Sequence, residues 1–216
     1  MIEIVPSGDS IIIIKELNNL KSSTLTNYIE KLNLTEIEDV ISLKNSVGII
    51  FNPHKITSSE FIKNIKKLIS NKNLTNNKSL KTWKIPICYD KGFAIDLDEI
   101  SSKCKLDIDQ VKKIHKESTY QVDMVGFLPG FLYLGNLDKS LHLPRKKNPR
   151  THIPEGSIGI AGNQTGIYNI ESPGGWNIIG RTPLRLFDKL KEPPIKIKQG
   201  DKIIFEEITK KEFNAY

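Results

Sequence analysis

Two segments of this 216-residue chain combine cationic side chains with prolines or glycines, a combination that suits the binding of an anion. The first, "LPRKKNPRTHIP", carries Arg145, Lys146, Lys147 and Arg150. Its prolines favour a rigid extended loop, and a guanidinium group offers a planar fork for a carboxylate or phosphate. We therefore predict that this loop recognises an anion, with a solvated surface as the alternative for the two lysines.

The second segment, "SPGGWNIIGRTPLRLF" at residues 172–187, places a glycine pair and a tryptophan beside Arg181 and Arg185. Glycines reach backbone angles that other residues avoid, so a loop here can bring its N–H groups close to a ligand. The same mixture also fits a tight barrel corner that the tryptophan fills. Both interpretations, an anion cradle and a barrel corner, stay open from the residues alone.

Other kinds of chemistry find little support in the sequence. The chain has no P-loop, no H-E-x-x-H and no paired C-x-x-C, so no metal site is predicted. Cys88 and Cys104 fit no disulfide framework, which favours a reduced, cytoplasmic setting. Ser157 is interpreted as a turn serine rather than a nucleophile, and His115 as a packing residue on a helix rather than a base.

Charge and hydropathy exclude two further classes of protein. The formal net charge is +7, but no aromatic residues interleave with the cationic run as base-stacking platforms would require. No nucleic-acid partner is therefore expected. The longest uncharged apolar run, "MVGFLPGFLYLG", is too short to span a bilayer, and "MIEIVPSGDS" has no signal-peptide pattern, so no membrane association is expected.

The elements that must position these residues divide the chain at about residue 80. In residues 1–80 the pattern predicts two hairpins, at "IEIVPSGDSIIIIK" and "DVISLKNSVGIIFN". It also predicts two helices, one at 23–32 and one that begins after Thr57. These elements make a small α+β domain. The polar stretch "SNKNLTNNKSLK" is interpreted as a linker.

Residues 81–216 predict a barrel preceded by a helical segment. A strand at 83–88 leads to two helices, each with a predicted capping box: Asp96 with Glu99, and Asp107 with Gln110. Beyond residue 120 helical periodicity ends, and most of the glycines and prolines of the chain follow. Short apolar runs between Gly and Pro turns are typical of a β-barrel or sandwich, and they include "SIGIAG", "GIYNI", "WNIIG", "LRLF", "IKIK" and "KIIFEEI".

Several motifs together resemble the KipI and 5-oxoprolinase B-subunit family, also called allophanate hydrolase subunit 1. They are "GFLPGFLYLG", "LPRKKNPR", "IPEGSIGIAGNQTGIYNIESPGGWNIIGRTP" and "QGDKIIF", with "GDSIIII" and "IPICYDKGFAIDLDEIS" upstream. The resemblance implies a bacterial protein with an α+β N-terminal domain and a C-terminal cyclophilin-like β-barrel. It also implies work with two partners, a sister cyclophilin-like subunit of the C type and an A-type subunit. Together these form an ATP-dependent 5-oxoprolinase, with Mg²⁺ as a companion of ATP, that converts 5-oxoproline to glutamate. Other members are described as inhibitors of histidine kinase autophosphorylation, which is the alternative function.

On that resemblance we build a hypothesis for the site. Three arginines, Arg145, Arg150 and Arg181, surround anionic groups, and the N–H groups of Gly174 and Gly175 form a nest. The remaining positions supply hydrogen bonds or an apolar wall, and they are Gln164, Thr165, Tyr168, Thr182 and Trp176. An exposed patch of Phe127, Phe131 and Tyr133 is predicted to contact a partner. The same segment around Trp176 could instead only close the barrel.

Overall fold

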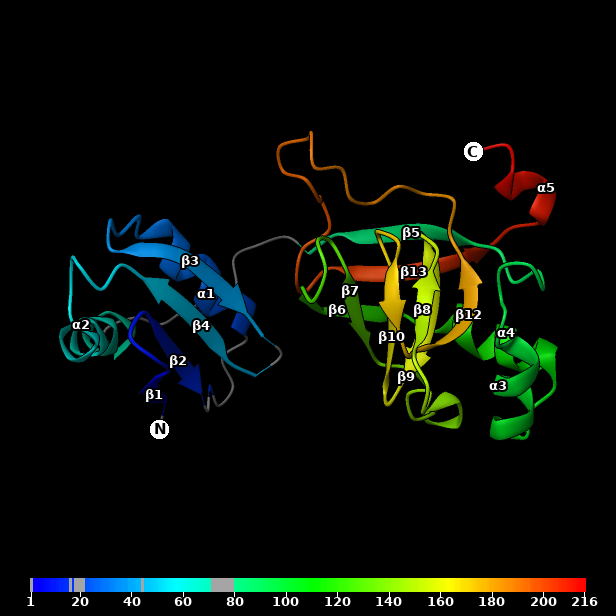
Figure 1. The fold of residues 1–216 in the computed structure, drawn as a ribbon, viewed down its shortest axis with the longest axis horizontal. Coiled ribbons are helices and arrows are strands. Elements are labelled where there is room, and N and C mark those ends of the chain that lie inside the picture. Colours follow the sequence, from blue (N-terminus) through cyan, green and yellow to red (C-terminus); the bar gives the residue numbers. More distant parts are fainter. Residues whose placement is uncertain (1, 16, 18–21, 44, 71–79) are drawn as a thin grey trace. The chain divides into compact units, whose positions relative to one another are not determined.

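The computed structural model describes residues 2–15, 17, 22–43, 45–70 and 80–216. Its residues fall into two compact units, Met1–Ser79 and Leu80–Tyr216, shown in Figure 1. Most of the predicted linker, residues 71–79, lies outside the described residues, as does Lys44 of the second predicted turn.

The first unit is an antiparallel sheet with two helices. Its elements are β1 (Glu3–Pro6), β2 (Ile11–Lys15), α1 (Ser22–Lys31), β3 (Ile37–Ser42), β4 (Val47–Phe51) and α2 (Ser58–Ser70). The strand order is β1-β2-β4-β3, and both predicted hairpins are present. Phe61, Ile65 and Ile69 recur at helical spacing on α2 and are buried in the core of this unit. The predicted α+β class is confirmed.

The second unit is a nearly closed barrel with helices at its start (Figure 1). Its first half contains β5 (Thr82–Ile87), α3 (Leu97–Cys104), α4 (Ile108–Glu117), β6 (Tyr120–Val125), β7 (Leu132–Gly135) and the short helix η1 (Lys139–Leu141). Its second half contains β8 (Arg150–Ile153), β9 (Ser157–Ala161), β10 (Gln164–Ile167), β11 (Ser172–Gly174), β12 (Asn177–Arg181), β13 (Lys202–Glu207) and α5 (Lys210–Phe213).

The barrel sheet has the order β12-β9-β10-β7-β6-β13-β5, and β8 pairs with β11 beside it. The two edge strands meet just beyond β5. There Cys88 donates its N–H to Arg181 O at 2.8 Å, and Arg181 N–H donates to Cys88 O at 3.0 Å. This exchange of hydrogen bonds satisfies edge groups that would otherwise be open to another chain.

Two of the strands predicted for the barrel are absent from the structure, so these two predictions are wrong. "LRLF" and "IKIK" do not form strands, and their only recorded pairing in the described chain is an isolated bridge between Phe187 and Ile195. Both segments still contribute apolar side chains to the barrel core, since Ile197 is buried and Leu184, Leu186 and Ile195 pack against the cluster. In these two segments the alternation of apolar residues therefore indicates which side chains are buried, and it does not indicate a strand.

The two predicted helix caps differ in outcome. Asp107 caps α4 as expected, because its carboxylate accepts from Gln110 N–H at 2.7 Å while Gln110 Oε1 accepts from Asp107 N–H at 2.9 Å. Asp96 precedes α3 but makes no side-chain cap hydrogen bond. The capping box predicted for Asp96 and Glu99 is therefore wrong, and both carboxylates have other partners, described below.

His115 of α4 is fully buried in the barrel core, as the packing interpretation predicts. Thr165 donates its hydroxyl hydrogen to Gly159 O at 3.0 Å, so it accepts from His115 Nε2–H, which lies 3.2 Å away. His115 Nδ1 is then free to accept from the Tyr89 hydroxyl at 2.8 Å. The imidazole is neutral and has a partner at each nitrogen.

Burial lowers the pKa of His115 to about 3, and this predicts a pH dependence of stability. Below pH 6.5 the unfolded chain binds a proton at His115 that the folded chain does not bind. The free energy of unfolding therefore decreases as the pH is lowered. One such histidine removes about 2 kcal/mol between pH 7 and pH 5. Urea unfolding of the wild type and of a His115→Gln variant at both pH values measures the loss of stability that is due to His115. A wild-type loss no larger than that of the variant, or an NMR titration midpoint for His115 near 6.5, would contradict it.

Candidate functional site

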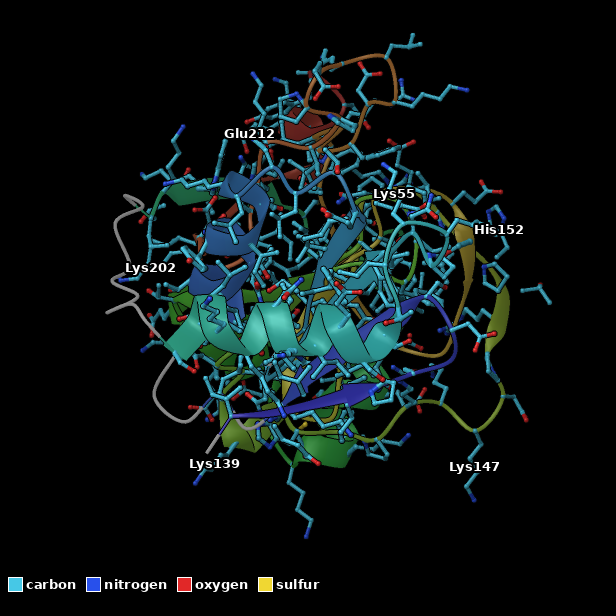
Figure 2. All side chains as sticks on the ribbon, turned by 90° about the vertical axis from the view of Figure 1, so that its left-hand side faces the viewer. Lys55, Lys139, Lys147, His152, Lys202 and Glu212 are labelled. Carbon is cyan, nitrogen blue, oxygen red and sulfur yellow. The ribbon has the colours of Figure 1, made fainter. Side chains whose placement is uncertain are left out.

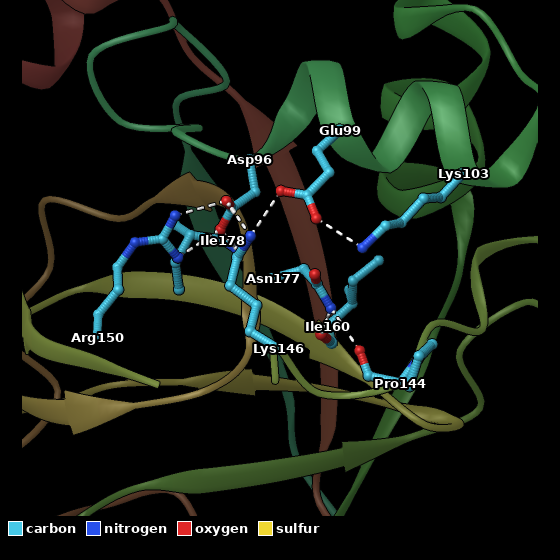
Figure 3. Close-up of polar contacts among 9 residues, drawn as sticks. All are labelled: Asp96, Glu99, Lys103, Pro144, Lys146, Arg150, Ile160, Asn177 and Ile178. Carbon is cyan, nitrogen blue, oxygen red and sulfur yellow. Dashed lines mark hydrogen bonds and ion pairs between the residues drawn. The ribbon is translucent and has the colours of Figure 1, made fainter. Parts of the chain in front are cut away.

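The candidate site lies where the cationic loop at residues 144–150 meets β12 and the start of α3. Asp96 is its centre, with only 3% of the residue exposed. Arg150 binds the Asp96 carboxylate with both terminal nitrogens, at 2.8 Å and 2.6 Å, and Lys146 Nζ lies 2.8 Å from Asp96 Oδ1. The backbone N–H of Ile178 donates to Asp96 Oδ2 at 2.7 Å (Figure 3).

A second carboxylate extends this cluster of charges towards solvent. Glu99 accepts from Lys146 Nζ at 2.6 Å and from Lys103 Nζ at 2.6 Å (Figure 3). These hydrogen bonds from Lys103 and Lys146 lower the pKa of Glu99 to about 2. Burial raises the pKa of Asp96, but the hydrogen bonds from Arg150, Lys146 and Ile178 outweigh burial and leave that pKa below its usual value. Both carboxylates are anions that already have partners.

Backbone and amide contacts also fix the cationic loop. Lys146 N–H donates to Gly175 O at 2.7 Å. Asn177, which is buried, donates from its side-chain amide to Pro144 O at 3.0 Å and to Ile160 O at 3.1 Å (Figure 3). The loop is therefore tied to β12 through Pro144 and to the turn before β12 through Lys146, and its last residue, Arg150, binds Asp96.

Arg145 stands on an aromatic surface next to this cluster. Its guanidinium carbon lies 5.8 Å from the ring centroid of Trp176. Tyr133 packs edge-on against the same indole at 5.8 Å between centroids, and Phe131 does so at 5.6 Å. In the part of the chain that the structure describes, Arg145 has no carboxylate partner. It is a cation with free hydrogen-bonding capacity above an aromatic wall.

A pair of glycines makes room for these rings. Gly159 on β9 and Gly166 on β10 are paired across the sheet. A Cβ atom on Gly159 would lie 2.9 Å from Trp176 Cβ, and one on Gly166 would lie 2.8 Å from Phe131 Cζ. The rings of Trp176 and Phe131 thus lie directly on the backbone of the sheet, a close approach that a larger residue would prevent.

The structure brings only some of the predicted site residues together. Arg145, Arg150, Tyr168 and Trp176 form one cluster. Burial raises the pKa of Tyr168 to about 12, against the opposing charges of Arg145 and Arg150. Arg181 lies at the other end of β12, about 13 Å along the strand. There its Nε donates to Glu155 O at 2.7 Å and its guanidinium lies over Phe93 and Phe213.

The predicted neutral partners have contacts inside the protein. Gln164 donates to Asp123 Oδ2 at 3.2 Å. Thr165 binds His115, as described, and the buried Thr182 accepts from Leu184 N–H at 3.2 Å. In this structure the three side chains therefore have hydrogen-bond partners within the chain.

The backbone conformation does not support the predicted nest at Gly174 and Gly175. A nest alternates right- and left-handed residues, but neither glycine has a positive φ. Gly174 pairs with Arg150 between β11 and β8 instead, and a Cβ on it would overlap the Tyr168 hydroxyl and lie 2.7 Å from Ile153 Cδ1. Glycine is required there by the space that Tyr168 fills.

The predicted contact patch also needs one correction. Phe131 is buried under Trp176, Tyr133 and Tyr168, so it belongs to the core. Phe127 is 70% exposed and has a φ of 72°, an uncommon conformation for a bulky residue. Tyr133 is half-buried. The exposed part of the patch is therefore Phe127 with the edge of Tyr133.

Comparison with known proteins places this chain in a family. Residues 2–197 match the family described as "Carboxyltransferase domain, subdomain C and D". The chain is 46% identical over 133 residues to the 5-oxoprolinase B subunit of Bacillus subtilis (strain 168), which covers 62% of this chain and 55% of that protein. It is 43% identical over 122 residues to the 5-oxoprolinase B subunit of Escherichia coli O157:H7, 56% of each chain. The chain thus spans little more than half the length of these curated relatives.

A solved structure agrees over the whole length. The conserved uncharacterized protein PH0987 from Pyrococcus horikoshii is 36% identical, with a TM-score of 0.60, and the match covers 98% of this chain and 100% of that one. In the described residues, no helix is long and apolar enough to cross a membrane, and no group of three or more His, Cys, Asp or Glu side chains is arranged to hold a metal ion.

The ion pairs predict different effects for the two arginines of the loop. Arg150→Ala leaves the buried Asp96 with less compensation and is expected to lower the free energy of unfolding by about 3 kcal/mol. Arg145→Ala removes only a contact with an aromatic face and is expected to cost less than about 1 kcal/mol. Urea unfolding of both variants measures the difference. Equal losses of stability would show that the two arginines do not have the separate roles described.

Proposed function

The chain belongs to the family of the carboxyltransferase domain, subdomain C and D, and we propose that it is the B subunit of an ATP-dependent, cytoplasmic 5-oxoprolinase. Such an enzyme opens the lactam of 5-oxoproline to give glutamate. The identity of 43–46% to proteins named as B subunits of 5-oxoprolinase supports this proposal. The word "subunit" in those names supports a complex. Its other members are proposed to be a sister cyclophilin-like subunit of the C type together with an A-type subunit.

The observation that carries the proposal is the position of Arg145. Among the described residues it is a loop cation without a carboxylate partner, and it lies over the indole of Trp176. 5-Oxoproline combines a carboxylate with a small five-membered lactam ring. A guanidinium can bind the carboxylate with two parallel hydrogen bonds. The partly exposed ring of Tyr133, which packs on the nearly buried Trp176, gives the substrate ring an apolar contact.

The role of these residues in the reaction is to bind and orient. A lactam resists hydrolysis because amide resonance makes its carbonyl carbon a poor electrophile. Phosphoryl transfer from ATP to the carbonyl oxygen would create a leaving group and open the carbon to water. Holding the carboxylate on Arg145 would fix the ring relative to both reactants, and orientation of this kind contributes much of the rate of such steps.

We assign ATP and its Mg²⁺ to the partner subunits rather than to this chain. The acidic side chains nearest the site are Asp96 and Glu99. The Asp96 oxygens are taken by Arg150, Lys146 and the Ile178 amide, and Glu99 is bound to Lys146 and Lys103. Carboxylates held in this way are poor ligands for Mg²⁺, which needs near-octahedral oxygen coordination. Phe127, the exposed aromatic residue of the patch, is our candidate for the contact with a partner.

The proposal predicts that Arg145→Ala raises the KM for 5-oxoproline at least tenfold in the assembled three-subunit enzyme. The physical reason is the loss of a charge-assisted bidentate contact, worth about 1.5–3 kcal/mol. Glutamate release from 5-oxoproline and ATP is the measurement. Lys147→Ala is the matched control, because Lys147 belongs to the same loop but extends away from it (Figure 2). That variant should retain the wild-type KM.

Two results would count against this function. Equal KM values for the wild type and Arg145→Ala would remove Arg145 from the substrate site. No glutamate release from any mixture of folded subunits would overturn the enzyme assignment and favour the alternative, a protein that binds a histidine kinase.

A further inference from the structure

We propose that Asp96 is the positioning residue of the candidate site: its buried carboxylate holds the cationic loop at residues 144–150 against β12, and this presents Arg145 over Trp176. The part of this inference that concerns substrate rests on the proposed function. The part that concerns the position of the loop rests on the geometry alone.

Asp96 connects three parts of the fold that are distant in sequence. It lies directly before α3, it accepts from Ile178 N–H of β12 at 2.7 Å, and it binds Arg150 at the start of β8 at 2.6 Å and 2.8 Å. Lys146 adds a fourth contact from the loop at 2.8 Å. Each carboxylate oxygen therefore has two donors, which fills the coordination of this buried group (Figure 3).

Asp96 has no contact with Arg145 and acts on it through its neighbours. Pro144 is tied to Asn177 by its carbonyl, and Lys146 is tied to Gly175 by its N–H and to Asp96 by its ammonium group. Arg145 stands between these two anchored residues. Its side chain consequently leaves the loop from a fixed backbone position, beside the Trp176 ring.

Neutralising Asp96 would convert these attractions into repulsion. Asn at position 96 has almost the same size, but it cannot neutralise Lys146 and Arg150, which are both partly buried cations. Glu99 would remain as the only carboxylate bound to Lys146 in the described contacts. Because an uncompensated buried charge is costly, the loop is expected to move away from β12 and take Arg145 with it.

The test uses Trp176 as a reporter of the loop. The chain has two tryptophans, so Trp83→Phe leaves Trp176 as the only one. In this background, with the fold verified by circular dichroism, Asp96→Asn should raise the acrylamide quenching constant of Trp176 at least twofold. Lys103→Ala is the matched control. It removes the outermost cation of the same cluster, which contacts Glu99 and not Asp96, and it should leave the quenching unchanged.

A kinetic measurement in the assembled enzyme separates this role from a general loss of stability. Asp96→Asn should raise the KM for 5-oxoproline at least tenfold and change kcat less than threefold, since the loop positions a binding group. A folded Asp96→Asn variant with wild-type quenching of Trp176 would overturn the inference. If the wild-type complex releases no glutamate, the proposed function fails, and the quenching result still decides the role of Asp96.

A second variant covers the case in which Asp96→Asn does not fold. Lys146→Met keeps Asp96 paired with Arg150 and with the Ile178 amide, so the buried carboxylate remains compensated. This change should raise the quenching of Trp176 by a smaller factor, about 1.5-fold, because one of the loop anchors is lost. Unchanged quenching in this folded variant would equally overturn the inference.

Discussion

The candidate site depends on one buried carboxylate and the donors that surround it. Asp96 accepts from a backbone amide and from two cationic side chains, and these come from β12, the loop and β8. A buried charge of this kind is tolerated only when its partners are placed with good geometry. The positions of α3, β12 and the cationic loop are therefore linked, and a change in one of them disturbs the others.

This constraint divides the cations of the loop by role. Arg150 and Lys146 neutralise Asp96 and Glu99, so their charges are used inside the protein. Arg145 points instead to the aromatic surface formed by Trp176 and Tyr133. The side chains of Trp176 and Phe131 pack directly against the backbone of the sheet, because the paired Gly159 and Gly166 have no side chains that would occupy this space. Glycines, aromatic rings and cations thus combine into one site, in which Arg145 is, among the described residues, the guanidinium without a carboxylate partner.

Features that depend on neighbouring residues could be predicted from the sequence, and features that depend on distant residues could not. The hairpins of the first unit and the cap of Asp107 on α4 rest on local spacing, and they are present. Asp96 and Glu99 have the same spacing as Asp107 and Gln110, but Asp96 binds Arg150, which is 54 residues further along the chain. No pattern of three or four residues contains that partner.

Burial explains two further outcomes, one that differs from the prediction and one that agrees with it. Phe131 lies in a glycine-rich apolar run for which we predicted an exposed contact with a partner. Its ring is instead buried in the core, in the space that the missing side chain of Gly166 leaves. For His115 the predicted packing role is confirmed. Its place on the apolar face of a helix predicted a packing role, and the structure adds the two hydrogen bonds, to Tyr89 and Thr165, that make burial possible.

A double-mutant cycle on Asp96 and Arg150 tests the central claim most directly. The free energies of unfolding of Asp96→Asn, Arg150→Met and the double variant would be measured against the wild type. If the pair holds the loop in place, the double variant should lose at least about 1.5 kcal/mol less than the sum of the two single losses. Losses that add within about 0.5 kcal/mol would show that the two residues act independently, and would contradict the account.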